Sequence, residues 1–127
     1  MTLRQVMPSA GERPLVLVIE DDPDLADILA EVMQDEGYRV CRADSLSSAR
    51  ASWERERPAV VVLDLWIDGE STEGVLAERA GNDESIVLCS GSNGARAIAD
   101  TFGVPFVRKP FELEELLSAM RERPTGR

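Results

Sequence analysis

The sequence contains no histidine at all. The chain therefore offers no imidazole base, no histidine metal ligand and no histidine that could carry a phosphoryl group. Cysteine is scarce as well, because Cys41 and Cys89 are the only two and they lack the C-x-x-C spacing. This arrangement favours two small packed side chains over a disulfide or a metal site.

Long hydrophobic runs are also missing, since no apolar run approaches the ~20 residues that cross a bilayer. Residues 1–14 contain no apolar segment typical of a secretory signal. The 14 basic residues are outnumbered by 24 acidic ones, and the formal charge is -10. Nucleic-acid binding would need a basic face. We therefore expect one soluble, cytoplasmic domain with neither a membrane nor a nucleic acid as partner.

What the chain does contain is five short apolar runs that alternate with amphipathic segments. We predict strands at 15–19, 38–41, 59–65, 85–90 and 104–107, with 59–65 central because it is the most hydrophobic. Helices are expected after Pro23, after Ser45, around 74–80, at 95–102 and after Pro110, and 66–73 is expected to be a polar loop. This alternation predicts a three-layer α/β domain with a parallel sheet.

The first predicted helix has the clearest signals. Asp22 can cap its N-terminus and Pro23 suits its first position, while Gly37 can end it. Apolar residues then repeat at helical spacing and predict a buried face, formed by Leu25, Ile28, Leu29, Val32 and Met33.

Reactive side chains follow the apolar runs, and ligands in such sheets bind beyond the carboxyl ends of the strands. Glu20 and Asp21 follow the first run, and Asp64 continues the third. Three carboxylates this close repel one another by about 4 kcal/mol per pair, which a hard cation such as Mg²⁺ would offset. The alternatives are that Glu20 and Asp21 only cap the helix, and that Asp64 only caps the next loop.

The same sheet edge carries groups suited to phosphoryl chemistry. A carboxylate such as Asp64 can act as a nucleophile and form an acyl phosphate. The Ser90 hydroxyl could donate to a phosphoryl oxygen, and the Lys109 ammonium could supply a positive charge. A cis bond before Pro110 would direct Lys109 across the strand ends. Residues 91–94 could form an amide nest for phosphate, although a plain turn is favoured.

The region from about Pro14 to Arg121 resembles the receiver domain of bacterial two-component response regulators. The resemblance depends on VLVIEDDPDL, VVLDL, CSG and VRKPF, which occur in this order and at about the family's spacing. It implies a flavodoxin-like (βα)5 fold with strand order 2-1-3-4-5. We expect the fourth helix to be shorter than is usual in the family. The domain would span 14–123, with a flexible N-terminal extension at 1–13 and a tail at 124–127.

The resemblance also implies a role for each site residue. Asp64 would accept a phosphoryl group from a phosphohistidine on a sensor histidine kinase or a histidine phosphotransfer protein. Mg²⁺ would be held by Glu20, Asp21, Asp64 and the backbone carbonyl of Trp66. Ser90 and Lys109 would contact the phosphoryl group, and Phe106 would be the switch aromatic.

On this interpretation the protein is a single-domain signalling phosphoprotein rather than an enzyme. No effector domain follows Arg127, so we expect output through an unknown effector protein or by phosphorelay, from a monomer or weak dimer. The chain departs from the family at Asp68, where proline is common, and at Gly91, where alanine is common. The stretch from Asp64 to Gly74 is about two residues longer than usual and that from Ser90 to Lys109 about three shorter.

Two other functions compete with this one. A degenerate receiver could act as an interaction module that does not depend on phosphorylation, and the altered loop and short helix favour it. A phosphatase of the haloacid-dehalogenase kind is disfavoured, because the position of its second aspartate is Trp66. We also hypothesise that the Trp66 ring shields the phosphoryl group on Asp64 from water.

Overall fold

The computed structural model describes residues 13–82 and 84–122. The predicted N-terminal extension, apart from Arg13, and the predicted tail at 124–127 lie outside the described residues, so these boundaries stay predictions. Among the helices of the described segments, none has the length and apolarity that crossing a membrane requires.

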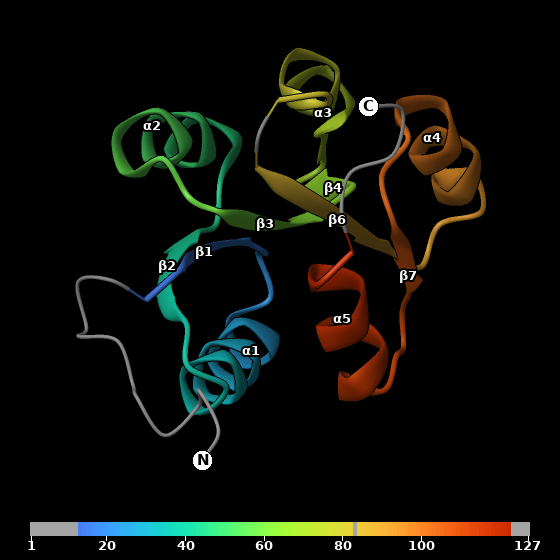
Figure 1. Ribbon diagram of the computed structural model, residues 1–127. Coiled ribbons are helices and arrows are strands. Elements are labelled where there is room, and N and C mark those ends of the chain that lie inside the picture. The colour runs from blue at the N-terminus through green and yellow to red at the C-terminus, as the bar shows by residue number, and fades with distance from the viewer. Residues whose placement is uncertain (1–12, 83, 123–127) are drawn as a thin grey trace.

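Five parallel strands form the central sheet (Figure 1). They are β1 (Leu15–Ile19), β2 (Arg39–Ala43), β3 (Val60–Asp64), β6 (Ser85–Ser90) and β7 (Phe106–Arg108). Their order in the sheet is β2-β1-β3-β6-β7, which confirms the predicted order and the central position of β3. Every residue of β1 and β3 is buried, because helices cover both faces.

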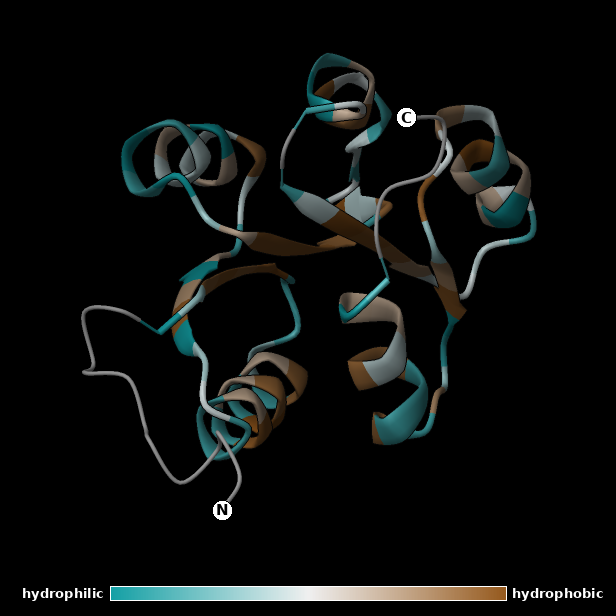
Figure 2. Cartoon of the chain, viewed as in Figure 1, coloured by the Kyte–Doolittle hydropathy of each residue, from teal (hydrophilic) through white to brown (hydrophobic). Residues whose placement is uncertain are grey.

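Five helices complete the three layers: α1 (Pro23–Asp35), α2 (Leu46–Glu56), α3 (Glu73–Arg79), α4 (Ala95–Phe102) and α5 (Leu113–Met120). Helices α2, α3 and α4 cover one face of the sheet, and α1 and α5 cover the other (Figure 1). Each face has its own hydrophobic cluster, centred on Trp53 and Leu76 on one side and on Leu29 and Leu116 on the other. Figure 2 shows apolar residues along the central strands and polar residues on the outer helix surfaces.

The predicted helix caps are present. The Asp22 carboxylate accepts hydrogen bonds from the backbone N–H groups of Asp24 and Leu25 at the start of α1. The Ser45 hydroxyl caps α2 by accepting from the N–H of Ser48, at 3.1 Å. Such caps compensate for the unpaired N–H groups of a first helical turn, so both helix starts follow from local sequence.

Several details of the sequence prediction were wrong, and one of them is that the strand predicted at 59–65 spans only Val60–Asp64. Ile28 is 51% exposed rather than part of the buried face of α1. It lies about 100° around the helix from Leu29, just outside the stripe that meets the sheet. Strand β2 continues to Ala43, and β7 begins at Phe106 instead of residue 104. The later start arises because Gly103, at φ +69°, ends α4 and the N–H of Val104 still donates to the Ala99 carbonyl.

The loop predicted at 66–73 contains a small antiparallel hairpin. Strands β4 (Trp66–Ile67) and β5 (Glu70–Ser71) pair with each other, and Asp68 and Gly69 form the turn between them. Both turn residues have positive φ, +52° and +78°, as a two-residue hairpin turn with primed geometry requires. Asp-Gly is the usual sequence signal for this turn, so the hairpin was predictable but the surrounding polar residues concealed it.

Candidate functional site

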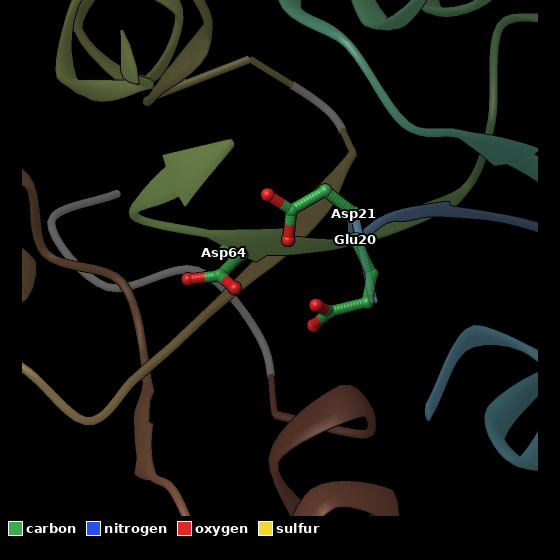
Figure 3. A group of neighbouring side chains, drawn as sticks. All are labelled: Glu20, Asp21 and Asp64. Atoms are coloured by element: carbon green, nitrogen blue, oxygen red, sulfur yellow. The ribbon is translucent and has the colours of Figure 1, made fainter. Parts of the chain in front are cut away.

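Three carboxylates meet at the carboxyl edge of the sheet. Glu20 and Asp21 directly follow β1, and Asp64 is the last residue of β3. Because β1 and β3 are neighbours, with Ile19 opposite Leu63, the ends of the two strands coincide. One carboxylate oxygen from each acid lies within 4.8 Å of the others, and Figure 3 shows the three side chains at the two strand ends.

The Lys109 ammonium joins two of these acids. Its Nζ lies 2.7 Å from Glu20 Oε1 and 2.8 Å from Asp64 Oδ2. The lysine follows β7 directly, and its backbone N–H donates to the Ser90 carbonyl on β6. The Lys109–Pro110 peptide bond is cis. The structure therefore brings together Glu20, Asp21, Asp64 and Lys109 from three strand ends.

Burial perturbs the ionisation of this group. Glu20 is buried, and loss of solvent raises the pKa of its carboxyl despite the hydrogen bond from Lys109. For Lys109 the largest single effect is burial, which alone would lower its pKa. The hydrogen bonds to Asp64 and Glu20 outweigh that effect, so the pKa of Lys109 is raised and the ammonium stays charged at neutral pH.

The acid set fits a divalent cation that prefers oxygen ligands. Glu20 and Asp64 are buried, whereas Asp21 is exposed, so one side of the cluster opens to solvent. Mg²⁺ typically binds one or two carboxylates and keeps several waters, which suits a site with an open side. The lysine pairs with Glu20 and Asp64 but not with Asp21, so the three acids keep an excess of negative charge that a cation would offset. The Trp66 carbonyl stays a predicted ligand.

Ser90 and Phe106 are not brought into this group. In residues 13–82 and 84–122 the Ser90 hydroxyl has no hydrogen bond to the acids or to Lys109, and Phe106 lies at the start of β7, paired with Leu88. Ser90 follows Cys89, the residue paired with Asp64, and its hydroxyl is 2.8 Å from the Ser92 hydroxyl. The Phe106 ring is half-buried, and two guanidinium groups lie over it, Arg96 at 5.2 Å and Arg108 at 5.3 Å from the ring centroid. Their predicted roles stay predictions.

Thr72 and the Asp68 amide are two groups that the sequence did not reveal. The Thr72 side chain is fully buried and its hydroxyl donates to the Asp64 carbonyl at 2.7 Å. The backbone N–H of Asp68 donates to Asp21 Oδ2, also at 2.7 Å. A threonine among polar neighbours looks solvated in sequence, and a backbone donor has no sequence signal, so only the fold identifies them.

Comparison with known proteins gives a consistent result. The family model described as "Response regulator receiver domain" matches residues 16–121. TcrX of Mycobacterium tuberculosis is 33% identical over 123 residues, which cover 91% of this chain and 53% of TcrX. The nitrogen assimilation regulatory protein NtrX of Azorhizobium caulinodans is 28% identical over 109 residues, covering 80% of this chain and 24% of NtrX.

A solved structure is similar along most of the chain. The receiver domain of NtrX from Brucella abortus superimposes with a TM-score of 0.71 at 26% identity, covering 83% of this chain and 97% of that domain. By contrast, the chain spans only about a quarter to a half of the two full-length relatives. The similarity therefore concerns one domain of those proteins.

Proposed function

The chain belongs to the response regulator receiver domain family, and on this premise we propose that Asp64 accepts a phosphoryl group from a phosphohistidine on a separate protein. The donor would be a sensor histidine kinase or a histidine phosphotransfer protein. The single observation that carries the proposal is the convergence of Glu20, Asp21 and Asp64 within 4.8 Å, joined by Lys109.

Asp64, Lys109 and Ser90 would each have a separate role in the phosphoryl transfer. An Asp64 carboxylate oxygen attacks the phosphorus, the new P–O bond forms, and the P–N bond to the donor imidazole breaks. The Lys109 ammonium, already 2.8 Å from Asp64 Oδ2, is close enough to stabilise negative charge on the transferred group. Ser90 would contact a phosphoryl oxygen after its hydroxyl leaves Ser92.

Glu20, Asp21 and Asp64, with the Trp66 carbonyl, would hold Mg²⁺ for this reaction. When bound, Mg²⁺ supplies positive charge that offsets the acids and the phosphoryl oxygens. Without such an ion, the negative charge of Glu20 and Asp21 would repel an incoming phosphoryl group. Support for this role comes from the chemistry of the donor set and from the open side at Asp21.

The phosphorylated form would signal by binding an effector or by passing the group on, with Phe106 as the switch. We place this activity in the cytoplasm, in a monomer or weak dimer. The family is a signalling family rather than one of metabolic enzymes, and we expect this chain to catalyse at most its own phosphorylation and dephosphorylation.

The decisive experiment incubates the protein with Mg²⁺ and a small acyl-phosphate or phosphoramidate donor. We expect one phosphoryl group on Asp64, detected by mass spectrometry, and none on Asp64→Asn. Asp44→Asn is a matched control, since Asp44 is an exposed acid outside the cluster. A wild-type protein that stays unlabelled under these conditions would rule the proposal out. Partner binding that is equal for wild type and Asp64→Asn would favour the degenerate receiver.

A further inference from the structure

The hairpin β4–β5 lies beside the acid cluster and is firmly anchored in the domain. Ile67, in its first strand, is fully buried in the hydrophobic cluster on the side of α2, α3 and α4. Thr72 closes its base, because the Thr72 N–H donates to the Leu65 carbonyl at 2.8 Å and its hydroxyl donates to the Asp64 carbonyl. The turn at Asp68 and Gly69 is therefore held at a defined place.

From that place the hairpin donates to two of the acids. The Asp68 N–H lies 2.7 Å from Asp21 Oδ2, and the Trp66 N–H lies 3.3 Å from Asp64 Oδ1. The bond from Asp68 is the short one and spans 47 residues of sequence. Within the part of the chain that the structure describes, it is the one recorded hydrogen bond to the Asp21 carboxylate.

Of the three acids, Asp21 is the one whose side chain is not already restricted by burial. Glu20 and Asp64 are buried and bonded to Lys109, so packing already restricts their side chains. Asp21 is exposed, and an exposed carboxylate loses side-chain freedom when it binds an ion. A donor on one oxygen restricts the side chain beforehand and leaves the other oxygen available to an ion.

We propose that the Asp68–Gly69 turn is a positioning element that orders Asp21 for cation binding through the Asp68 backbone N–H. The inference deepens the proposed function and depends on its Mg²⁺ site. Asp68 acts through its backbone, so its carboxylate is dispensable. What matters is that residue 68 has an N–H and can adopt a left-handed φ, here +52°.

The variants follow from these two requirements. Asp68→Pro removes the N–H and cannot reach a positive φ. Asp68→Asn and Asp68→Gly keep the N–H and tolerate a positive φ, so they serve as matched controls. Mg²⁺ binding to the full chain is measured by calorimetry, with the melting temperature as a check on folding. We expect Asp68→Pro to weaken Mg²⁺ binding about tenfold and both controls to stay within about twofold of wild type.

A double-mutant cycle separates positioning from general damage. In an Asp21→Ala background, Asp68→Pro should weaken Mg²⁺ binding no further, because the side chain that the turn orders is absent. An unchanged affinity in Asp68→Pro, or an equal loss in the Asp21→Ala background, would overturn the inference.

Amide hydrogen exchange tests the contact without any metal. The Asp68 amide should exchange at least about tenfold more slowly than the Gly69 amide, and Asp21→Ala should remove this protection. An unprotected Asp68 amide would overturn the inference even if Asp64 is phosphorylated. Conversely, a protected amide and weakened Mg²⁺ binding in Asp68→Pro, without phosphorylation of the wild type, would leave the positioning role intact and refute only the proposed transfer.

Discussion

Lys109 is the side chain on which the charge balance of the cluster depends. Its ammonium contacts Glu20 and Asp64 at hydrogen-bond distance, and its own side chain is only 24% exposed. In the metal-free protein it is therefore the cation that holds two repelling carboxylates together. The same ammonium would repel an incoming divalent cation, so its effect on Mg²⁺ binding and its effect on phosphoryl transfer should be opposite in sign.

Replacing Lys109 by methionine tests this opposition. We expect Lys109→Met to bind Mg²⁺ about tenfold more tightly, because a neighbouring positive charge is removed. Its phosphorylation by a small donor should nevertheless fall at least about tenfold, because the charge that stabilises the transferred group is lost. Calorimetry and mass spectrometry measure the two effects. Arg55→Met is the control, since Arg55 is an exposed cation that pairs with Glu56 in α2. Weaker Mg²⁺ binding in Lys109→Met would contradict the prediction.

The raised pKa of Glu20 predicts how Mg²⁺ binding depends on pH. Burial holds the proton on Glu20 to a higher pH than the ordinary value of 4.5, and Mg²⁺ must displace that proton. Affinity should therefore fall as the pH is lowered from neutral to about pH 5, earlier than for an ordinary glutamate. Mg²⁺ titrations across this pH interval should show a smaller fall in affinity for Glu20→Gln than for wild type, because glutamine has no proton to displace. Equal falls in affinity would contradict the competition between Mg²⁺ and the Glu20 proton.

The raised pKa of Glu20 also determines how the stability of the metal-free protein changes with pH. The folded protein binds the Glu20 proton more tightly than the unfolded chain does, so this residue contributes most to stability below pH 4.5. That contribution is lost as the pH rises through the raised pKa of the folded state. Mg²⁺ would offset the loss at neutral pH by binding the ionised form.

Trp66 is 49% exposed on the first strand of the hairpin, two residues after Asp64. If its ring shields phosphorylated Asp64 from water, Trp66→Ala should lose the phosphoryl group about two- to fivefold faster after the donor is removed. Trp66→Phe, which keeps an aromatic ring, should remain close to wild type. A Trp66→Ala protein that dephosphorylates no faster would refute the shielding hypothesis.

Among the secondary-structure elements, the hairpin is anchored in part by one buried hydroxyl. Thr72 contacts the Asp64 and Leu65 carbonyls at 2.7 and 3.2 Å, and Thr72→Val would replace that donor with a methyl group. We expect a loss of about 1–3 kcal/mol in the free energy of unfolding, because buried acceptors lose their partner. Urea denaturation measures this loss.

A threonine outside the core provides the comparison. The Thr101 hydroxyl also donates to a backbone carbonyl, that of Ala97, but on the exposed surface of α4. Water can replace that bond, so Thr101→Val should change the free energy of unfolding by no more than about 0.5 kcal/mol. Thr72→Ser should recover most of the lost stability. Equal costs in Thr72→Val and Thr101→Val would show that the buried hydroxyl does not anchor the hairpin.

At the scale of the whole molecule, the alkylation rates of the two cysteines measure how the domain opens. Both thiols are free, and burial raises the pKa of Cys89, in the inner strand β6, to about 12. The reactive thiolate is therefore negligible in the folded protein at about pH 8. In Cys41→Ser, alkylation of Cys89 should follow global unfolding and slow about tenfold when Mg²⁺ is at ten times its Kd.

The complementary variant, Cys89→Ser, leaves only Cys41. This residue is half-buried in the edge strand β2, and burial raises its pKa as well. Its alkylation should be faster than that of Cys89 and nearly independent of Mg²⁺, since an edge strand opens without global unfolding. If Mg²⁺ has no effect on Cys89 labelling, then the ion does not stabilise the folded domain.

Much of this protein was determined by the sequence alone. The alternation of buried runs and amphipathic segments specified the strands and helices, because a continuous apolar run or a period of 3.6 residues depends only on neighbours along the chain. The carboxyl ends of parallel strands lie at one edge of a sheet, so the convergence of Glu20, Asp21, Asp64 and Lys109 followed from their positions after those runs.

Tertiary structure decided the contacts between segments that are distant in sequence. The bond between Asp68 and Asp21 spans 47 residues, and the bonds of Lys109 to Asp64 and Glu20 span 45 and 89. Local periodicity carries no information about such pairs, because they form only when the packed sheet brings strand ends and the hairpin together. The sequence therefore determined which charged side chains reach the site, and the fold decided which of them bond and added the Asp68 amide and the Thr72 hydroxyl.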